Sequence, residues 1–301
     1  MATPVGSVGA VVVNHDGGHL LRQCVASLRA EAVDEIVVVD NASSDGSIAA
    51  LRAAEPEVVV VETGTNLGYG AGANRGLAAV TAEFVLVANP DVRVHRGSLS
   101  TLAAALRADA TLAIAGPRID EPDGTRYPSA RRFPSVPDAA GHALLGLVVP
   151  GNRFTRRYRM ADLEAAVPTP VDWVSGACFL VRRQAFEELG GFDEGYFMYA
   201  EDVDLCWRAH SAGWGVVYVP GAVVTHLQGH ATARHPYRML VAHHRSAVRF
   251  AARSATGWRR ALVPLAGAAL AGRLLIAVAA QAVRSVQGGR RGWFRVLRPE
   301  D

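Results

Sequence analysis

The sequence has no lysine and only three cysteines, so all 31 of its basic residues are arginines. Cys24, Cys178 and Cys206 are far apart in the chain, lie in apolar surroundings and form no C-x-x-C pair. This spacing excludes a disulfide-stapled mini-protein and favours a reduced, intracellular setting. The N-terminus lacks the basic region of a secretory signal, and the apolar run before Asn14 is too short for one, so we expect no export.

The sequence also lacks internal repeats and low-complexity segments. Half of its 301 residues are hydrophobic and a fifth are charged, which excludes a disordered or collagen-like chain. The length predicts roughly two domains, or one large α/β domain with an appendage. We place the boundary between residues 1–228 and residues 229–301.

Acidic residues are nearly missing from the C-terminal part. Residues 229–301 contain 13 arginines but only Glu300 and Asp301, a balance of +11, whereas residues 1–228 have a balance of −8. A segment this basic is typical of one that meets phosphates, acidic lipids or nucleic acid. Because aromatic residues are not interleaved with its arginines, nucleic acid is not the expected partner.

Short runs of β-branched residues alternate with helical patterns in the first two-thirds of the chain. The expected strands are 8–13, 35–39, 58–61, 84–88, 172–181 and 215–219, and the expected helices are 20–32, 47–54, 70–80 and 203–212. Nearly continuous Val, Leu and Ile in the early strands indicate a parallel sheet that is buried on both faces. We therefore predict an α/β fold with a doubly wound, mostly parallel, Rossmann-like sheet, which binds ligands beyond the carboxyl ends of its strands.

Residues 261–283 form an apolar run long enough to span a bilayer. Arg273 interrupts the run, together with one proline and two glycines, and arginines flank both of its ends. On a helix, Arg259, Arg273, Arg284 and Gln287 share one narrow stripe, which favours a helix lying in a membrane interface. A helix packed on the first domain and a membrane-spanning helix are the alternatives.

Polar residues stand at the ends of the expected strands. The carboxylate of Asp40 can accept hydrogen bonds from the ribose or base of a nucleoside, although capping of the next helix is an alternative role. The glycine-rich turn 66–76 can bring backbone N–H groups close to a phosphate. It imitates a dinucleotide fingerprint, but it follows the third strand rather than the first, so an NAD site is disfavoured.

Asn89-Pro90-Asp91 follows the fourth strand. Pro90 makes the chain leave the sheet, which presents Asp91 as a single carboxylate suited to a divalent cation that bridges two phosphates. A plain Asx-Pro turn explains the tripeptide equally well. His226 is a further candidate metal ligand, whereas the later histidines match no standard zinc spacing.

Acidic and aromatic residues interleave between Phe192 and Arg208. Asp202 stands at the start of an expected helix, whose dipole favours an ionised carboxylate, as a general base for a sugar hydroxyl requires. Glu201, Asp204 and Arg208 are candidates for a supporting network, and a capping box with salt bridges is the structural alternative. Three aromatic residues could form an apolar wall for an acceptor sugar or belong to the core: Trp173, Phe197 and Tyr199.

Taken in order, these stretches resemble family 2 glycosyltransferases of the GT-A fold, and more narrowly bacterial rhamnosyltransferases that extend polyprenyl-diphosphate-linked sugars. The resemblance covers about residues 8–250. Its members are Asn14, Asp40-Asn-Ala-Ser-Ser-Asp45-Gly, Asn66-x-Gly68, Gly72-x-Asn74-Arg75-Gly76, Asn89-Pro-Asp91, Trp173-Val-Ser-Gly176-Ala, Phe192-Asp-Glu, Glu201-Asp202-x-Asp204-Leu and His226.

The resemblance implies an inverting transfer with Asp202 as base, next to Glu201, and Mg²⁺ or Mn²⁺ at Asp91 with His226 nearby. The family's metal motif often reads Asp-x-Asp, but here Asn89 stands first, which leaves one carboxylate fewer. The implied binding sets are, for a nucleotide-sugar donor, Asn14, Asp40, Asn66, Gly68, Asn74, Arg75 and Asn89, and, for the acceptor, Trp173, Phe197, Tyr199 and Asp204.

We therefore expect transfer of L-rhamnose from dTDP-rhamnose to a polyprenyl-diphosphate-linked N-acetylglucosamine. The C-terminal helical extension would then hold the protein on the anionic cytoplasmic face of the plasma membrane, as a peripheral or monotopic protein. UDP-galactofuranose and UDP-N-acetylhexosamine are alternative donors. A catalytically silent protein that binds a nucleotide sugar or a membrane is the alternative class, and the oligomeric state stays open.

Overall fold

The structure, a computed structural model, describes residues 6–133, 149, 151–160, 163, 165–227 and 236–296, with side chains described as far as residue 282. The chain divides into two compact units, Met1–Ala231 and Thr232–Asp301. We call the first the sheet unit and the second the helical unit. The predicted boundary between residues 228 and 229 falls in segment 228–235, which lies outside the described residues.

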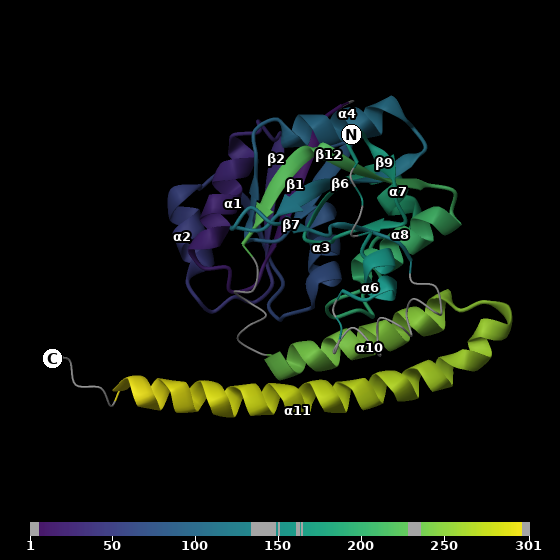
Figure 1. Cartoon of the computed structure of the whole chain (residues 1–301). Helices are drawn as coiled ribbons and strands as arrows, with labels where there is room; N and C mark the ends of the chain where they lie inside the picture. Colours follow the sequence, from purple (N-terminus) through teal and green to yellow (C-terminus); the bar gives the residue numbers. More distant parts are fainter. Residues whose placement is uncertain are drawn as a thin grey trace. The chain divides into compact units, whose positions relative to one another are not determined.

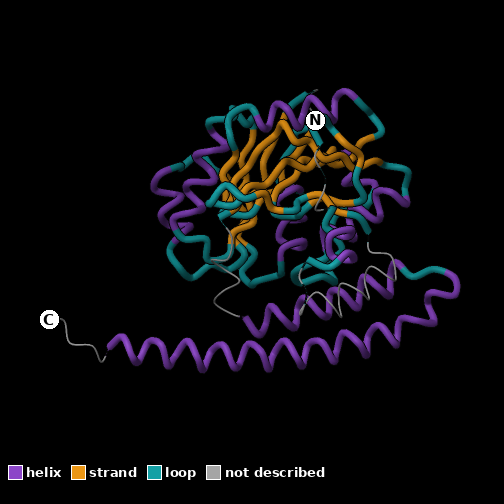
Figure 2. Tube along the Cα trace, in the orientation of Figure 1, coloured by secondary structure: helices purple, strands orange, loops and turns teal. Residues whose placement is uncertain are grey.

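The sheet unit is built on one large sheet of ten strands among the described residues, with helices on both faces (Figures 1 and 2). Its central order is β3-β2-β1-β4-β11-β6-β12-β5, while β7 pairs with β6, β9 pairs with β12, and β8 and β10 form a separate pair. The strands are β1 (Val8–Asn14), β2 (Glu35–Asp40), β3 (Val59–Glu62), β4 (Phe84–Ala88), β5 (Val92–Val94), β6 (Leu112–Asp120), β7 (Arg126–Tyr127), β8 (Ala130–Arg131), β9 (Thr169–Pro170), β10 (Trp173–Val174), β11 (Cys178–Arg182) and β12 (Gly215–His226).

Helices cover both faces because the side chains of each strand alternate between them. On one face Ala10, Val12 and Val38 belong to a large apolar core with residues of α1, α2 and α4. On the other face α3 packs against Val11 and Val39. The helices of this unit are α1 (His19–Arg29), α2 (Ser47–Ala54), α3 (Tyr69–Leu77), α4 (Ser98–Ala108), α6 (Arg153–Tyr158), α7 (Arg183–Glu188) and α8 (Glu201–Ser211).

The predicted α/β fold is confirmed, with a parallel order β3-β2-β1-β4 as expected. The single strand predicted over 172–181 is wrong, because the chain turns between β10 and β11, and β11 runs antiparallel to both β4 and β6. The stretch after β6 contains the short strands β7 and β8. The strand β6 and the helix α4 were not predicted.

The helical unit contains α10 (Pro236–Ser254), the short 3₁₀-helix η1 (Gly257–Leu262) and α11 (Val263–Val296). Residues 257–282 are long and apolar enough to cross a membrane by length and composition alone, with a mean hydropathy of 2.0. Arg273 is half-buried, whereas the side chains of Arg284 and Gln287 lie outside the described residues. The predicted arginine stripe therefore remains a prediction.

One face of α11 is apolar and exposed. Leu265, Leu275 and Ile276 are 68%, 73% and 62% exposed. From Val263 to Ala280, every residue of α11 that is classed as exposed is an aliphatic residue, glycine or proline. An apolar face of this length is typical of a surface that meets a membrane or another protein.

We expect Gly76→Ala to destabilise the sheet unit. A Cβ at residue 76 would lie 2.3 Å from Val11 Cγ1 and 2.8 Å from Val39 Cγ2, so α3 would have to move away from the sheet. Overpacking of this kind costs about 1–3 kcal/mol, measurable as a lower thermal midpoint. The control is Gly221→Ala, whose Cβ would meet only Thr101 Cγ2, at an ordinary 3.7 Å. Equal midpoints for the two variants would contradict this account of the packing.

Candidate active site

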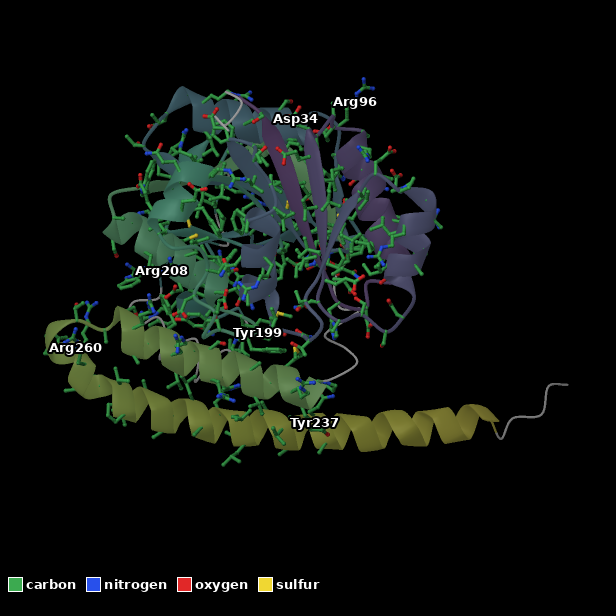
Figure 3. The ribbon with its side chains drawn as sticks, turned by 180° about the vertical axis from the view of Figure 1, so that it is seen from behind. Asp34, Arg96, Tyr199, Arg208, Tyr237 and Arg260 are labelled. Atoms are coloured by element: carbon green, nitrogen blue, oxygen red, sulfur yellow. The ribbon has the colours of Figure 1, made fainter. Side chains whose placement is uncertain are left out.

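The candidate site lies at the edge of the sheet where the parallel strands end. Asn14 and Asp40 are register partners at the ends of β1 and β2, and Val12 pairs with Ala88, which directly precedes Asn89. In Figure 3, Tyr199 lies toward the end of the sheet unit opposite to Asp34, the residue just before β2. The polar residues at these strand ends, distant in sequence, therefore share one edge.

Asp91 and His226 meet at this edge. His226 ends β12 and pairs with Val92 of the antiparallel β5, which brings its Nε2 to 3.1 Å from Asp91 Oδ1 and 3.3 Å from Asn89 Nδ2. The side chains of Asp91 and His226 are 12% and 13% exposed. An oxygen and an imidazole nitrogen this close together can both contact a single divalent cation.

The described residues contain no group of three or more His, Cys, Asp or Glu side chains arranged for a metal. Asp91 and His226 alone are nevertheless a reasonable pair of metal ligands, because Mg²⁺ usually takes few protein ligands and completes its coordination shell with water and substrate phosphates. The residues present therefore fit a cation that is shared with a diphosphate. Asn89, where the related motif has a carboxylate, lies beside the same imidazole nitrogen.

Asn41, which the sequence reasoning missed, organises the loop between β3 and α3. It is 2% exposed, and its Nδ2 donates to Asn66 Oδ1 and to the Gly68 carbonyl, while its Oδ1 accepts from the Leu67 amide. Asn14 has a similar supporting role. It is fully buried, and its Nδ2 donates to the hydroxyls of Ser43 and Ser47. Asn14 therefore supports the loop after β2, and its expected donor contact stays a prediction.

The glycine-rich turn approaches protein backbone rather than leaving room for a phosphate. Gly68 has φ of +91°, and a Cβ there would lie 2.2 Å from the Phe197 carbonyl oxygen. The Gly68 amide donates to Asn66 Oδ1 and the Tyr69 amide donates to that same Phe197 oxygen. These two amides at the start of α3 therefore bind protein groups, and the donor contact expected at Gly68 stays a prediction.

Asn74 and Arg75 hold the aromatic loop that follows α7. Asn74 Nδ2 donates to the Phe192 carbonyl and its Oδ1 accepts from the Phe192 amide, which clamps this residue from both sides. Arg75 pairs with Glu194 at 3.1 Å. Both side chains therefore bind the protein itself, and the expected donor contacts are replaced by a structural role.

Asp202 begins the first turn of α8 and faces the turn between β10 and β11. Its Oδ2 accepts from the Gly176 amide at 2.7 Å and its Oδ1 accepts from its neighbour Val203 at 2.8 Å. Burial raises the pKa of Asp202, while these two amides and the guanidinium of Arg131 act in the opposite direction. The sequence predicts that the helix start favours an ionised carboxylate, whereas burial in the structure raises the pKa of this carboxyl. A raised pKa makes the carboxylate a stronger base.

Tyr69 connects the carboxylates. Its buried hydroxyl donates to the Gly176 carbonyl at 2.6 Å. Burial raises its pKa well above the usual range, with further contributions from the charges of Glu201, Asp202 and Asp91. The turn that contains Gly176 also reaches the end of β4, because the Ala177 carbonyl accepts from the amide of Asn89, two residues before Asp91. Since the Gly176 amide binds Asp202, adjacent residues of one turn connect Asp202 to the segment that carries Asp91.

Two family descriptions match the chain. Residues 9–190 match Glycosyl transferase family 2, and residues 151–283 match Glycosyl transferase family group 2. The chain is 43% identical over 264 residues to the N-acetylglucosaminyl-diphospho-decaprenol L-rhamnosyltransferase of Mycobacterium tuberculosis, covering 83% of this chain and 86% of that protein. This chain belongs to glycosyltransferase family 2. The predicted family and enzyme class are confirmed.

Solved structures share the fold of this glycosyltransferase. The mannosyltransferase PcManGT from Pyrobaculum calidifontis, in complex with GDP-Man and Mn²⁺, gives a TM-score of 0.56 at 19% identity over 97% of this chain and 82% of that chain. S. aureus TarS in complex with UDP gives a TM-score of 0.54 at 16% identity, covering 89% of this chain and 71% of that chain. The predicted GT-A fold is therefore confirmed.

Three of the residues expected to bind the acceptor differ in how far they are buried. Asp204 is fully buried and accepts from Arg208 Nε within α8 at 2.7 Å. Its Oδ1 accepts from the Tyr196 hydroxyl at 3.3 Å, which holds α8 to the loop before it, and its expected acceptor contact stays a prediction. Trp173 is 4% exposed and donates its indole N–H to the Arg132 carbonyl, which makes it a core residue. Tyr199 is partly exposed and has φ of +67°.

The segment before α8 has an unusual backbone. Tyr199 and Ala200 adopt φ of +67° and +64° in succession, directly before Glu201 and Asp202. Non-glycine residues in this region cost of order 1–3 kcal/mol each and persist where surrounding contacts hold them. Here the Phe197 carbonyl is held by the Tyr69 amide. Phe197 and Tyr199 therefore stay candidates for the acceptor side of the site.

Arg131, another residue that the sequence reasoning missed, lies in an aromatic cage. Its guanidinium carbon lies 4.8 Å from the ring centre of Trp173, 5.4 Å from that of Tyr127 and 5.8 Å from that of Tyr158. Its Nη2 donates to the Tyr127 hydroxyl and its Nε to the Pro128 carbonyl. Cation–π contacts and these bonds fix a positive charge that lowers the pKa of Asp202.

Glu201 gives the glycosyltransferase a pH-dependent stability. Burial, followed by the charge of Asp202, raises its pKa from 4.5 to about 8. Between these values the folded protein holds a proton that the unfolded chain has released. Stability is therefore lost as the pH rises through this window, at most on the order of 1 kcal/mol per pH unit.

We expect Glu201→Gln to remove this loss, because a neutral amide needs no proton to stay buried. Its thermal midpoint should be near that of the wild type at pH 5 and above it at pH 8. Glu187→Gln, at a side chain that is 64% exposed, serves as the control and should follow the wild type at both pH values. A constant difference between Glu201→Gln and the wild type across this range would contradict the assignment.

Proposed function

We propose that this enzyme transfers L-rhamnose from dTDP-rhamnose to an N-acetylglucosaminyl-diphospho-polyprenol, with inversion at the anomeric carbon. The observation that carries the proposal is the 43% identity to the mycobacterial L-rhamnosyltransferase, over 83% of this chain and 86% of that protein. Incubation with dTDP-rhamnose, UDP-galactofuranose and UDP-N-acetylglucosamine, with the lipid acceptor in detergent, tests it. The mass of the product identifies the sugar, and a product from a UDP-sugar alone would contradict the proposed donor.

We assign binding of the nucleotide-sugar donor to residues at the strand ends whose side chains are partly exposed. Asp40 at the end of β2 is partly exposed, as are Asn66 and Asn89. Asp91 and His226 would hold Mg²⁺ or Mn²⁺, in keeping with the Mn²⁺ and GDP-Man bound to PcManGT. When bound, the cation would neutralise the charge that develops on the departing dTDP. The acidic side chains of the site would otherwise repel a diphosphate.

Proton removal falls to Asp202. The acceptor hydroxyl oxygen forms a bond to the anomeric carbon of rhamnose, the bond from that carbon to the diphosphate breaks, and Asp202 receives the hydroxyl proton. The Gly176 amide fixes one oxygen of Asp202, and Arg131 opposes the rise in its pKa so that the carboxylate form is available. Glu201, buried beside it with a pKa of about 8, is mainly protonated at neutral pH and thus leaves a single negative charge at this position.

The exposed apolar face of α11 supports a membrane location. Leu265, Leu275 and Ile276 can enter the acyl region of a leaflet, while arginines of the same unit contact anionic headgroups. This arrangement suits an enzyme whose acceptor is embedded in a bilayer. We place the enzyme on the cytoplasmic face of that bilayer, where nucleotide sugars are available.

We expect Asp202→Asn to lower kcat by at least about 100-fold, because an amide cannot take the acceptor proton. The dissociation constant of dTDP-rhamnose should stay within about twofold, since the substitution is isosteric and removed from the strand ends that hold the donor. Glu187→Gln, at an exposed carboxylate of α7, is the control and should keep kcat. A variant at Asp202 that retains wild-type kcat would remove this residue as the base.

We expect Asp91→Ala to lose metal-dependent donor binding. Calorimetry with dTDP-rhamnose should show at least about tenfold weaker binding than the wild type in the presence of Mg²⁺, and equal binding without it. His226→Ala should act in the same direction because its Nε2 lies 3.1 Å from the Asp91 carboxylate. Asp109→Ala removes a carboxylate before β6, at the opposite edge of the sheet, and should bind as the wild type does. Full Mg²⁺-dependent binding by Asp91→Ala would contradict the metal assignment.

A further inference from the structure

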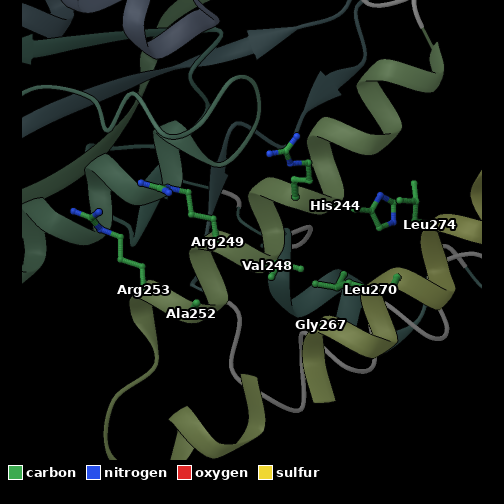
Figure 4. Close-up of a pocket in the computed structure, with 10 residues that line it drawn as sticks. His244, Val248, Arg249, Ala252, Arg253, Gly267, Leu270 and Leu274 are labelled. Atoms are coloured by element: carbon green, nitrogen blue, oxygen red, sulfur yellow. The ribbon is translucent and has the colours of Figure 1, made fainter. Parts of the chain in front are cut away.

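A groove runs between α10 and α11 within the helical unit, and the proposed chemistry leaves it without a role. Its volume is about 750 Å³, within the range of about 300–1,000 Å³ that is usual for small-molecule sites. Figure 4 shows His244 and Val248 of α10 on one side and Leu270 and Leu274 of α11 on the other. The floor is apolar, and its shape is elongated along the two helices.

One edge of the groove is strongly basic. Arg245, Arg249 and Arg253 line it at intervals of four residues on α10, so they form a row along one side of that helix. All three are exposed. The sequence from 229 to 299 contains no acidic residue, so this stretch is strongly basic. Figure 4 shows Arg249 and Arg253 extending from α10 away from the apolar floor.

A buried polar atom also faces this region. The His244 side chain lines the groove and is only 6% exposed. Its Nδ1 lies 2.8 Å from the Leu240 carbonyl oxygen, but its Nε2 is buried without a hydrogen-bond partner. A buried nitrogen without a partner costs free energy, which a ligand with a polar head would recover.

We propose that this groove binds the isoprenoid diphosphate part of the acceptor, with the prenyl chain on the apolar floor and the diphosphate on the arginine row. The inference rests on the proposed function for the identity of the lipid. An apolar floor beside a row of guanidinium groups complements a molecule that joins a hydrocarbon chain directly to two phosphates. His244, whose Nε2 has no hydrogen-bond partner, lines the same floor.

The groove offers a matched pair of substitutions. A Cβ at Gly267 or at Gly272 would meet no heavy atom within 4 Å, so both positions accept a larger side chain. Gly267 lines the groove, whereas Gly272 is exposed on α11 and does not. Gly267→Leu should therefore fill the site without straining the helix, and Gly272→Leu adds the same apolar side chain outside it.

The binding test uses the full chain in a non-ionic detergent and a benzophenone-bearing farnesyl diphosphate as photo-crosslinking probe. Crosslinked peptides should map to residues 244–253 and 267–274, and unlabelled farnesyl diphosphate should compete at least about tenfold better than farnesol or phosphatidylglycerol. Gly267→Leu should reduce labelling by about tenfold, while Gly272→Leu should label as the wild type does. Equal competition by phosphatidylglycerol would show a general surface for anionic lipids and overturn the proposal.

The arginine row is tested by charge-matched double variants. Arg245→Gln with Arg249→Gln should weaken farnesyl diphosphate binding about tenfold, because charge-assisted hydrogen bonds to the phosphates are lost. Arg259→Gln with Arg260→Gln removes the same charge from η1, outside the groove, and should leave binding unchanged. Equal weakening by both double variants would overturn the proposed site, since it would mean that overall charge alone attracts the probe.

The two proposals fail in different ways. If the wild type transfers rhamnose to the lipid acceptor but Gly267→Leu leaves both labelling and the KM for that acceptor unchanged, the groove proposal is wrong and the proposed function stands. If no sugar is transferred from any donor while farnesyl diphosphate still labels the groove and Gly267→Leu blocks it, the proposed function is wrong and the groove remains a lipid-diphosphate site.

Discussion

The site depends on three hydrogen bonds made by two residues between β10 and β11. The Gly176 amide binds the Asp202 carboxylate, the Gly176 carbonyl accepts from the Tyr69 hydroxyl, and the Ala177 carbonyl accepts from the Asn89 amide. This short turn therefore joins α8, α3 and the end of β4. Gly176 has little space for a side chain, because a Cβ there would lie 3.0 Å from Asp202 Cβ.

Around this turn the protein uses its own polar groups to shape the site before any ligand binds. Asn41, Asn74 and Asn14 satisfy backbone and hydroxyl groups of neighbouring loops, and the glycines of α3 allow close approach to the sheet and to Phe197. The few ionisable groups left at the edge are tuned by their surroundings. Burial raises the pKa of both Glu201 and Asp202, and a caged guanidinium at Arg131 opposes the rise at Asp202.

The helical unit combines two surfaces of different chemistry. The exposed residues of α11 between Val263 and Ala280 are apolar, while α10 presents a row of arginines beside an apolar groove. A membrane-bound, doubly charged lipid needs both kinds of contact, since its chain is insoluble in water and its phosphates are insoluble in hydrocarbon. The strong separation of charge along the sequence, −8 before residue 229 and +11 after it, agrees with the proposed role of the helical unit.

The sequence by itself determined the alternation of strands and helices, the family, and the edge of the sheet at which the site lies. These depend on local periodicity and on polar residues that follow apolar runs. It placed Asp91 beside His226 and Asp202 at the start of a helix, as the structure has them. Only the tertiary structure decided that β11 is antiparallel, that Asp204 and Trp173 are buried, and that the amides at Gly68 and Tyr69 bind protein groups. Those outcomes depend on partners more than a hundred residues away, as with Tyr69 and Phe197, or on the pairing of a short turn, and neither leaves a signal in local spacing. The role of Arg131 could not be predicted from the sequence for the same reason, because its aromatic cage forms only when β8 pairs with β10.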